Sequence, residues 1–151
     1  MNHKKVRSQK SKTPLVHSLE VAIPQFSERL LPEIGVGSGF PLILIRIGIS
    51  GAVNPRTGLF KLTTFDLVDL YNRKVGRKLN NKTLVGPNTK IRRKTSLPIL
   101  RLPFQPSVLN ISKFVFLKLN PILNRKELTL EFVTATFTDG TGVTKRKDFR
   151  K

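Results

Sequence analysis

The chain has 151 residues and carries 28 Lys and Arg against 9 Asp and Glu, which gives a formal net charge of +19 at pH 7. This length fits one domain with a core of its own. The absence of Cys excludes a disulfide framework and a thiolate zinc site. No apolar run reaches the roughly 18–20 residues of a membrane-spanning helix, and the basic start of the chain lacks the apolar segment of a secretory signal.

The positive charge is concentrated in two parts of the chain. Residues 1–19 hold five bases and no acid, and Leu70–Lys126 holds 14 Lys or Arg without a single carboxylate. Such a field destabilises the folded protein through self-repulsion, and a bound polyanion relieves it. Nucleic acid is the commonest polyanion, so the charge pattern predicts a nucleic-acid-binding protein.

The first third of the chain combines a polar arm with two strand patterns. Residues 1–14 show no apolar periodicity, and we interpret them as a disordered basic arm in front of a β-rich domain, 15–151. Apolar residues at alternate positions predict a strand over Leu15–Ile23. Phe40–Val53 has alternating isoleucines on one face and a largely apolar opposite face, which predicts a central strand.

Turn and capping signals organise the next segment. Residues 54–58 read Asn-Pro-Arg-Thr-Gly, a strong turn signal, after which Leu59–Thr63 would return as a hairpin strand. A short helix is expected near 65–75, because threonines can cap its start and aspartates suit its first half. The polar, basic stretch 76–96 contains Asn-Asn and Gly-Pro-Asn and is predicted to be the basic binding loop.

The last third of the chain is predicted to be strands. Leu97–Phe104 contains two prolines, which would confine it to a sheet edge. Ile111–Leu119 is rich in β-formers. Glu127–Phe137 alternates clearly, with a change of phase after Phe132 that predicts a β-bulge. An Asp-Gly turn then leads into a final strand over Val143–Phe149.

These elements add up to about seven or eight short strands and one helix, joined by Gly- and Pro-containing turns. Such a pattern is typical of a mainly β, single-domain sandwich or barrel. A single jelly roll is the first choice among these folds.

The residues that catalysis requires are sparse. His3 lies in the arm, and His17 lies on the apolar face of a predicted strand, where a structural role is the usual one. Asp66 and Asp69 suit the dipole of the predicted helix better than a metal ion, because further ligands are missing. Gly35–Gly39 lacks the Lys and Ser or Thr of a phosphate-binding loop, so we interpret it as a turn. We therefore expect no enzyme, no metal and no cofactor.

The expected binding residues are bases of the arm, the middle block and the C-terminal cluster. A merely solvated surface is the alternative, but such surfaces normally mix both signs of charge. No helix-turn-helix, zinc-finger or RRM-like pattern is present, so we expect contacts with phosphates of RNA or single-stranded nucleic acid. The candidates are Lys4, Lys5, Arg7, Lys10, Lys12, Arg73, Lys74, Arg77, Lys78, Lys82, Lys90, Arg92, Arg93, Lys94, Lys145, Arg146 and Lys147.

This layout of basic arm, compact β-domain and basic excess resembles that of small viral coat proteins with a single jelly roll, such as those of plant satellite viruses. The resemblance implies a capsid protein that packages RNA and assembles into a homo-oligomer or shell. A viral movement protein or RNA-silencing suppressor is one alternative, and a ribosomal or ribonucleoprotein structural protein is another. The virion or host cytoplasm is the expected location, with the nucleus as an alternative.

Overall fold

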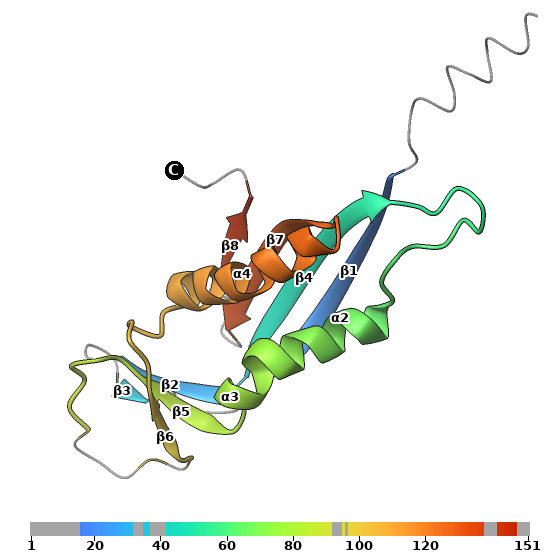
Figure 1. Ribbon diagram of the computed structural model, residues 1–151. Coiled ribbons are helices and arrows are strands. Elements are labelled where there is room, and N and C mark those ends of the chain that lie inside the picture. The colour runs from blue at the N-terminus through green and yellow to red at the C-terminus, as the bar shows by residue number, and fades with distance from the viewer. Residues whose placement is uncertain are drawn as a thin grey trace, which may run out of the picture.

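The structure is a computed structural model that describes residues 16–31, 35–36, 42–91, 95, 97–137 and 142–147. These residues form two four-stranded sheets and two longer helices (Figure 1). The predicted basic arm, 1–14, lies outside the described residues. No helix in the described part of the chain is long and apolar enough to cross a membrane.

The first sheet is antiparallel throughout, with strand order β1-β4-β7-β8. Its strands are β1 (Val16–Gln25), β4 (Ile43–Ala52), β7 (Thr129–Phe137) and β8 (Gly142–Arg146). The sequence predictions of a strand at each of these places are confirmed, and β4 is central as expected. Its four alternating isoleucines are fully buried, since successive side chains of a strand point to opposite faces.

The predicted β-bulge is present. Gly48 pairs with Phe132 while Ile49 pairs with Leu130, so Glu131 is the extra residue on β7. The change of apolar phase in the sequence therefore has the expected cause, one residue earlier than the pattern indicated.

The second sheet is mixed, with strand order β3-β2-β5-β6. The chain enters it directly from the first sheet, because β2 begins two residues after β1 ends. Its strands are β2 (Ser27–Leu31), β3 (Gly35–Val36), β5 (Lys82–Val85) and β6 (Ile99–Arg101). Strand β5 runs parallel to both β2 and β6. Strand β6 is at the edge of the sheet, as its flanking prolines predicted.

The predicted helix near 65–75 is confirmed as α2 (Thr64–Tyr71), which continues into the π-helix η1 (Asn72–Gly76) and one short turn, α3 (Arg77–Leu79). Thr63 caps α2, since its hydroxyl accepts from the Asp66 backbone N–H at 3.0 Å. The Asp66 carboxylate accepts in return from the Thr63 N–H at 3.1 Å, which completes a capping box.

The second long helix, α4 (Val108–Arg125), corrects the predicted strand over Ile111–Leu119. Its buried side chains recur every four residues, at Ile111, Val115, Leu119 and Leu123, which is the helical period. The Ser107 hydroxyl caps the helix by accepting from the Asn110 N–H. A short run of Phe, Val and Leu occurs both in strands and in buried helices. The nine residues of the predicted strand are too few to reveal the helical period, so the prediction was wrong.

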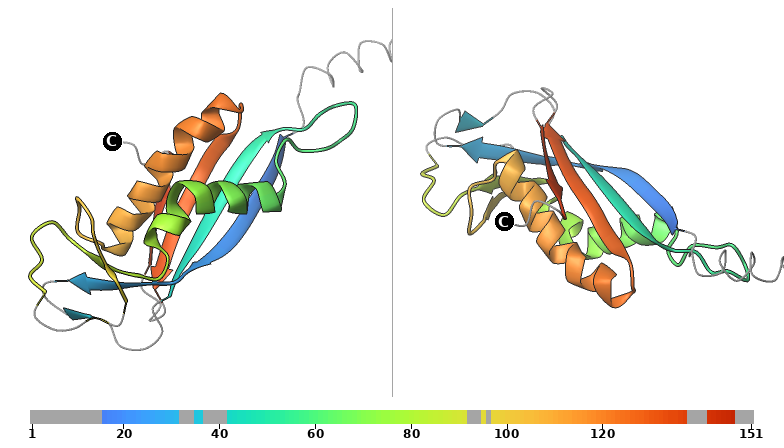
Figure 2. Two further views of the ribbon diagram at one scale, coloured as in Figure 1. Left: turned by 60° about the horizontal axis from the view of Figure 1, so that its bottom comes forward. Right: turned by 90° about the horizontal axis from the view of Figure 1, so that it is seen from above.

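Helices α2 and α4 cover the same face of the first sheet (Figure 2). The core lies between this face of the sheet and the two helices. It consists of the isoleucines of β4, the inner residues of β1 and β7, and the buried faces of both helices. The protein is thus rich in sheet, as predicted, but its strands do not close into a barrel within the described residues, and the jelly roll is not confirmed.

Two further predictions on this part of the chain need correction. Leu59–Thr63 forms no strand and leads straight into α2, although the turn before it is present: Asn54 O accepts from the Gly58 N–H at 2.8 Å. The basic stretch 76–96 is not a loop throughout, because α3 and β5 lie within it. A high content of Lys and Asn masked the short apolar run of β5 that enters the second sheet.

Candidate functional site

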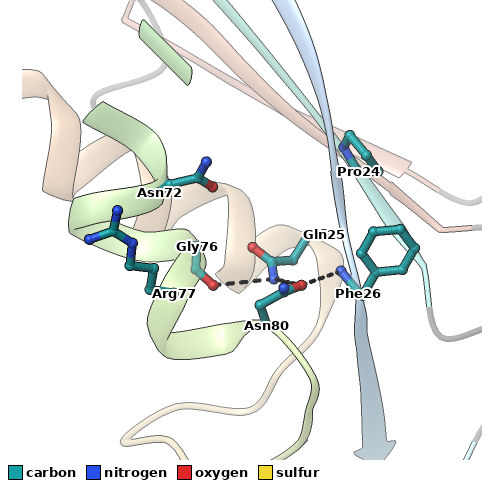
Figure 3. Close-up of a pocket in the computed structure, with 7 residues that line it drawn as sticks. All are labelled: Pro24, Gln25, Phe26, Asn72, Gly76, Arg77 and Asn80. Atoms are coloured by element: carbon teal, nitrogen blue, oxygen red, sulfur yellow. Dashed lines mark hydrogen bonds between the residues drawn. The ribbon is translucent and has the colours of Figure 1, made fainter. Parts of the chain in front are cut away.

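A pocket opens where β1 ends and the helical segment η1–α3 passes beside it (Figure 3). Its volume is about 280 Å³. Its lining comes from the end of β1, the residue that follows it, the η1–α3 segment and the residue after that segment: Pro24, Gln25, Phe26, Asn72, Gly76, Arg77 and Asn80. Most of these groups are polar, and none is a carboxylate, imidazole or thiol.

The helical wall of the pocket is a π-helix, a rare element that is frequent at functional sites. Gly76 ends this segment, and a side chain there would collide with its neighbours. A Cβ on Gly76 would lie 2.7 Å from Asn72 Oδ1 and 2.9 Å from a ring carbon of Tyr71. The glycine therefore allows Tyr71 and Asn72 to pack close to the backbone at the pocket wall.

Gln25 is the centre of a buried hydrogen-bond network behind the pocket. Its side chain is 2% exposed. Gln25 Oε1 accepts from the Tyr71 hydroxyl at 2.6 Å, and its Nε2 donates to Asn80 Oδ1 at 3.1 Å. Longer contacts of 3.4 Å connect the same nitrogen to Gly76 O and Ser27 Oγ. The strand and the helix are thereby held in one geometry.

Asn80 joins the same network from the end of the helix. Its Oδ1 also accepts from the Phe26 backbone N–H at 3.0 Å. One residue further on, the Ser27 hydroxyl donates to Leu79 O at 2.6 Å. The Asn80 amide nitrogen and the Asn72 side chain make no hydrogen bond to the described residues, so both are available to a ligand.

The electrostatics of the pocket favour neutral or anionic ligands. Behind the pocket, burial raises the pKa of the Tyr71 hydroxyl, which keeps its proton and its hydrogen bond to Gln25. Arg77 is exposed at the pocket rim and forms no ion pair with the described residues. The Phe26 ring is 46% exposed and offers an apolar surface beside these polar groups.

Of the predicted binding residues that the structure describes, only Arg77 lines this pocket. Arg73 and Lys74 are exposed on η1, and Arg73 Nε donates to Asp69 at 2.9 Å. Lys78 is exposed on α3, Lys82 begins β5, and Lys90 is exposed beyond β5. The five arm residues together with Arg92, Arg93 and Lys94 lie outside the described residues.

The C-terminal candidates lie elsewhere, at the end of β8. Arg146 lies over the Phe132 ring at 5.7 Å and Lys145 over the Phe116 ring at 5.9 Å. Lys147 forms an ion pair with Glu131 at 3.1 Å. These cations are engaged with the protein itself, and they do not share the pocket with Arg77.

Asp66 and Asp69 have the role at the helix that the sequence predicted. Asp66 completes the capping box and Asp69 pairs with Arg73. Hydrogen bonds from the Thr63 backbone and hydroxyl lower the pKa of Asp66. Among the residues that the structure describes, no three His, Asp or Glu side chains are placed to hold a metal ion.

Three amides at the pocket were not predicted from the sequence: Gln25, Asn72 and Asn80. No local signal distinguishes these amides, because the sequence around each of them is that of an ordinary strand, helix or loop. Arg77 was predicted as a binding residue only because of its charge. The residues become a site only when β1 and the helical segment come together.

Comparison with known proteins identifies the fold. No protein-family model matches the sequence, and no curated protein matches it. Solved structures do match. An uncharacterized protein of Wolinella succinogenes is 8% identical with a TM-score of 0.66, over 88% of this chain and 99% of that chain. The 6-pyruvoyltetrahydropterin synthase of Plasmodium vivax is 10% identical with a TM-score of 0.56, over 87% and 99%.

The Caenorhabditis elegans 6-pyruvoyltetrahydropterin synthase gives the same result, with 14% identity, a TM-score of 0.54 and coverage of 88% and 96%. At these identities the likeness shows the fold alone. The chain therefore has the fold that these synthases share.

This fold overturns the functional interpretation of the sequence. The viral coat protein interpretation is wrong, and its alternatives, a movement protein, a silencing suppressor and a ribosomal protein, fall with it. The expectation of RNA or single-stranded nucleic acid as the partner is contradicted too, as is the expectation that the chain is not an enzyme, because the named neighbours are enzymes. The virion or host cytoplasm as its location and the homo-oligomer stay predictions.

Proposed function

We propose that the pocket between β1 and the η1–α3 segment binds a small planar heterocycle with the hydrogen-bonding pattern of a pterin. One observation carries the proposal. Two amide side chains, Asn72 and Asn80, have free hydrogen-bonding groups at a pocket whose geometry is fixed by the buried Gln25 network.

The chemistry of such a ring matches the lining. A pterin has donors and acceptors side by side along the edge of its pyrimidine ring. The Asn72 side chain offers one of each, and Asn80 offers its amide N–H groups, because its oxygen already accepts from Gln25 and from the Phe26 backbone. The Phe26 ring supplies an apolar face against which a flat ring can stack. The volume of about 280 Å³ is at the lower end of ligand pockets and suits one bicyclic ring.

The solved neighbours support this choice of ligand. Their names describe enzymes that make a pterin, 6-pyruvoyltetrahydropterin. A shared fold can carry different functions, so the pocket and not the fold is the basis of the proposal.

A fluorescence titration with pterin tests the proposal. The ligand fluoresces, and the chain has no Trp to interfere. We expect saturable quenching by the wild-type protein, and at least about tenfold weaker binding for Asn72→Ala or Phe26→Leu, because each removes one side of the proposed contact.

The matched control is Asn124→Ala, which removes an exposed amide from α4 and should bind as the wild type does. Circular dichroism would confirm that each variant is folded. Absence of saturable binding by the wild type would refute the proposal, and so would equal binding by all variants.

A further inference from the structure

The outer side of α4 carries leucines where a surface helix normally carries polar residues. Leu117 and Leu109 are 65% and 48% exposed, although the opposite side of the same helix packs into the core. Figure 2 shows α4 over the first sheet with its other side facing outward. A single exposed leucine is ordinary, so the neighbours of these two leucines decide whether this side of the helix has a function.

Helix geometry places the two leucines in one row with a lysine. Residues four apart are neighbours on a helix, with about 5–6 Å between their Cβ atoms, so Leu109, Lys113 and Leu117 follow one another along the surface. The adjacent row contains Phe114 and Lys118, and Lys118 Nζ lies 5.5 Å from the centre of the Phe114 ring. These five side chains are called the α4 strip below.

The charge of the α4 strip is positive and is not balanced on the helix itself. The 18 residues of α4 include no Asp or Glu, and Lys113 and Lys118 are exposed without an ion pair to the described residues. A base at the end of a helix suits its dipole, but these two are in the middle, where an acid four residues away is the usual partner. Glu127, which follows the helix, is already paired with Lys61 at 3.0 Å.

We propose that the α4 strip docks an acidic amphipathic helix of another protein. Apolar side chains of the partner would cover Leu109 and Leu117, and its carboxylates would meet Lys113 and Lys118. The two leucines are about 12 Å apart along the helix axis, so two or three turns of a partner helix cover the strip. A contact of this size is expected to be weak and transient. The inference is independent of the pocket, because no residue of the α4 strip lines it.

Other occupants fit the α4 strip less well. A second copy of the chain that used the same strip would bring the lysines of both copies together, and like charges repel. A bilayer takes up a wide apolar face of a helix, and that face of α4 is turned into the core. A partner that offered only phosphates would pair with the lysines and leave the exposed leucines uncovered.

A designed peptide of about 14 residues is the probe, long enough for almost four helical turns. Its leucines are three and four residues apart on one side, with glutamates beside them. Fluorescence anisotropy of the labelled peptide should show saturable binding to the full chain, and the binding should weaken as salt is added. A scrambled peptide of the same composition should bind at least about tenfold more weakly, because it keeps the charge and loses the apolar side.

Two charge variants separate the α4 strip from the general basicity of the chain. Lys113→Glu with Lys118→Glu should weaken binding of the designed peptide at least about tenfold. The matched control is Lys74→Glu with Lys78→Glu, which makes the same change of net charge at exposed positions of η1 and α3. This control should bind the peptide almost as the wild type does.

The apolar contact has a test of its own. Leu117→Ser should weaken binding of the peptide about tenfold, whereas Ile99→Ser, which changes a 43% exposed side chain of β6, should not. The chain has no Trp, so a single tryptophan reports on its own surroundings. Leu117→Trp should show a blue-shifted emission when the designed peptide is added, and Ile99→Trp should show none. Circular dichroism would confirm that each variant is folded.

Several results would overturn the proposal. If the wild type does not bind the designed peptide, or if the scrambled peptide or the two lysine pairs give equal binding, the α4 strip recognises no such helix. If Leu117→Ser binds as the wild type does, the contact is one of charge alone. If Leu117→Trp responds to phosphatidylserine vesicles and not to the peptide, or if Leu117→Ser dissociates a dimer in sedimentation without peptide, a lipid surface or a second copy covers the strip instead.

Discussion

Two regions of the molecule differ in the polar groups they contain and in how far these are buried. One is the junction of β1 with the helical segment η1–α3, and the other is the outer edge of the first sheet. At the junction, neutral amides and hydroxyls around Gln25 are buried and hydrogen-bonded to one another. At the edge, charged side chains such as Arg146 and Lys147 reach Phe132 and Glu131 at the surface. Loss of a buried partner leaves an unsatisfied group, whereas an exposed ion pair is replaced by water, so the neutral network should stabilise the fold more than the charges do.

Removal of Gln25 is expected to have the largest effect. Gln25→Ala leaves the buried Tyr71 hydroxyl without its acceptor and opens a cavity beside it. We expect the free energy of unfolding to fall by about 2–4 kcal/mol. Urea denaturation followed by circular dichroism measures the change.

The partner variant Tyr71→Phe separates the hydrogen bond from the packing. In a double-mutant cycle with Gln25→Leu, the two changes should be less than additive by about 1 kcal/mol, because both remove the same bond. Strict additivity would show that the 2.6 Å contact does not stabilise the protein.

Gly76→Ala should come next in size. Its Cβ would lie 2.7 Å from Asn72 Oδ1, so Asn72 or the π-helix must shift. We expect a loss of about 1–3 kcal/mol of stability, together with weaker ligand binding at the pocket. Gly58→Ala is not a suitable control because φ is +71° there, so Lys78→Ala on the exposed face of α3 is the comparison. A fully stable Gly76→Ala with normal binding would contradict the account of the pocket wall.

The same contrast explains which parts of the fold could be predicted. Strand β4 was predicted correctly because its four isoleucines alternate over the seven residues from Ile43 to Ile49, and a pattern of that length indicates a strand. Helix α4 was predicted to be a strand because its most apolar part is short and consists of β-branched and aromatic residues. Its helical period appears only over the longer stretch Ile111–Leu123. Pairing between distant segments, such as β2 with β5, leaves no local trace.

The pocket could not be predicted, for the same physical reason. A charged surface can be predicted from a sequence when many Lys and Arg residues stand close together, and Arg77 was predicted for that reason. An amide network is defined by contacts over 46 to 55 residues, as between Gln25, Tyr71 and Asn80. Those residue types are common in ordinary turns and helices, so only their meeting in space identifies them.

A smaller effect is expected from the cap of α2. Thr63→Ala removes the hydroxyl that accepts from the Asp66 N–H and should lower stability by about 1 kcal/mol. Thr57→Ala removes an exposed hydroxyl that accepts from the Leu59 N–H in the turn before the helix, where water can replace it, and should change stability by less than about 0.5 kcal/mol. Thermal unfolding of the two variants side by side decides whether the cap matters, and equal midpoints would refute it.

The smallest effect, and the one that depends on pH, concerns the sheet edge. The Ser50 hydroxyl donates to the Glu131 carboxylate and, with Lys147, holds its pKa below the usual range against partial burial. Because the folded-state pKa lies below the unfolded value of about 4.3, this stabilisation is present above that pH and is lost as pH falls through the folded-state pKa. Ser50→Ala should therefore lower the free energy of unfolding by about 0.5–1 kcal/mol at pH 7 and by less at pH 3. Lys147→Gln, which breaks an exposed ion pair with Glu131, should change it by at most about 0.5 kcal/mol at pH 7. Urea titrations at the two pH values measure the free energy of unfolding of both variants. If the loss of stability in Ser50→Ala does not diminish in acid, the hydroxyl acts through packing and not through the charge of Glu131.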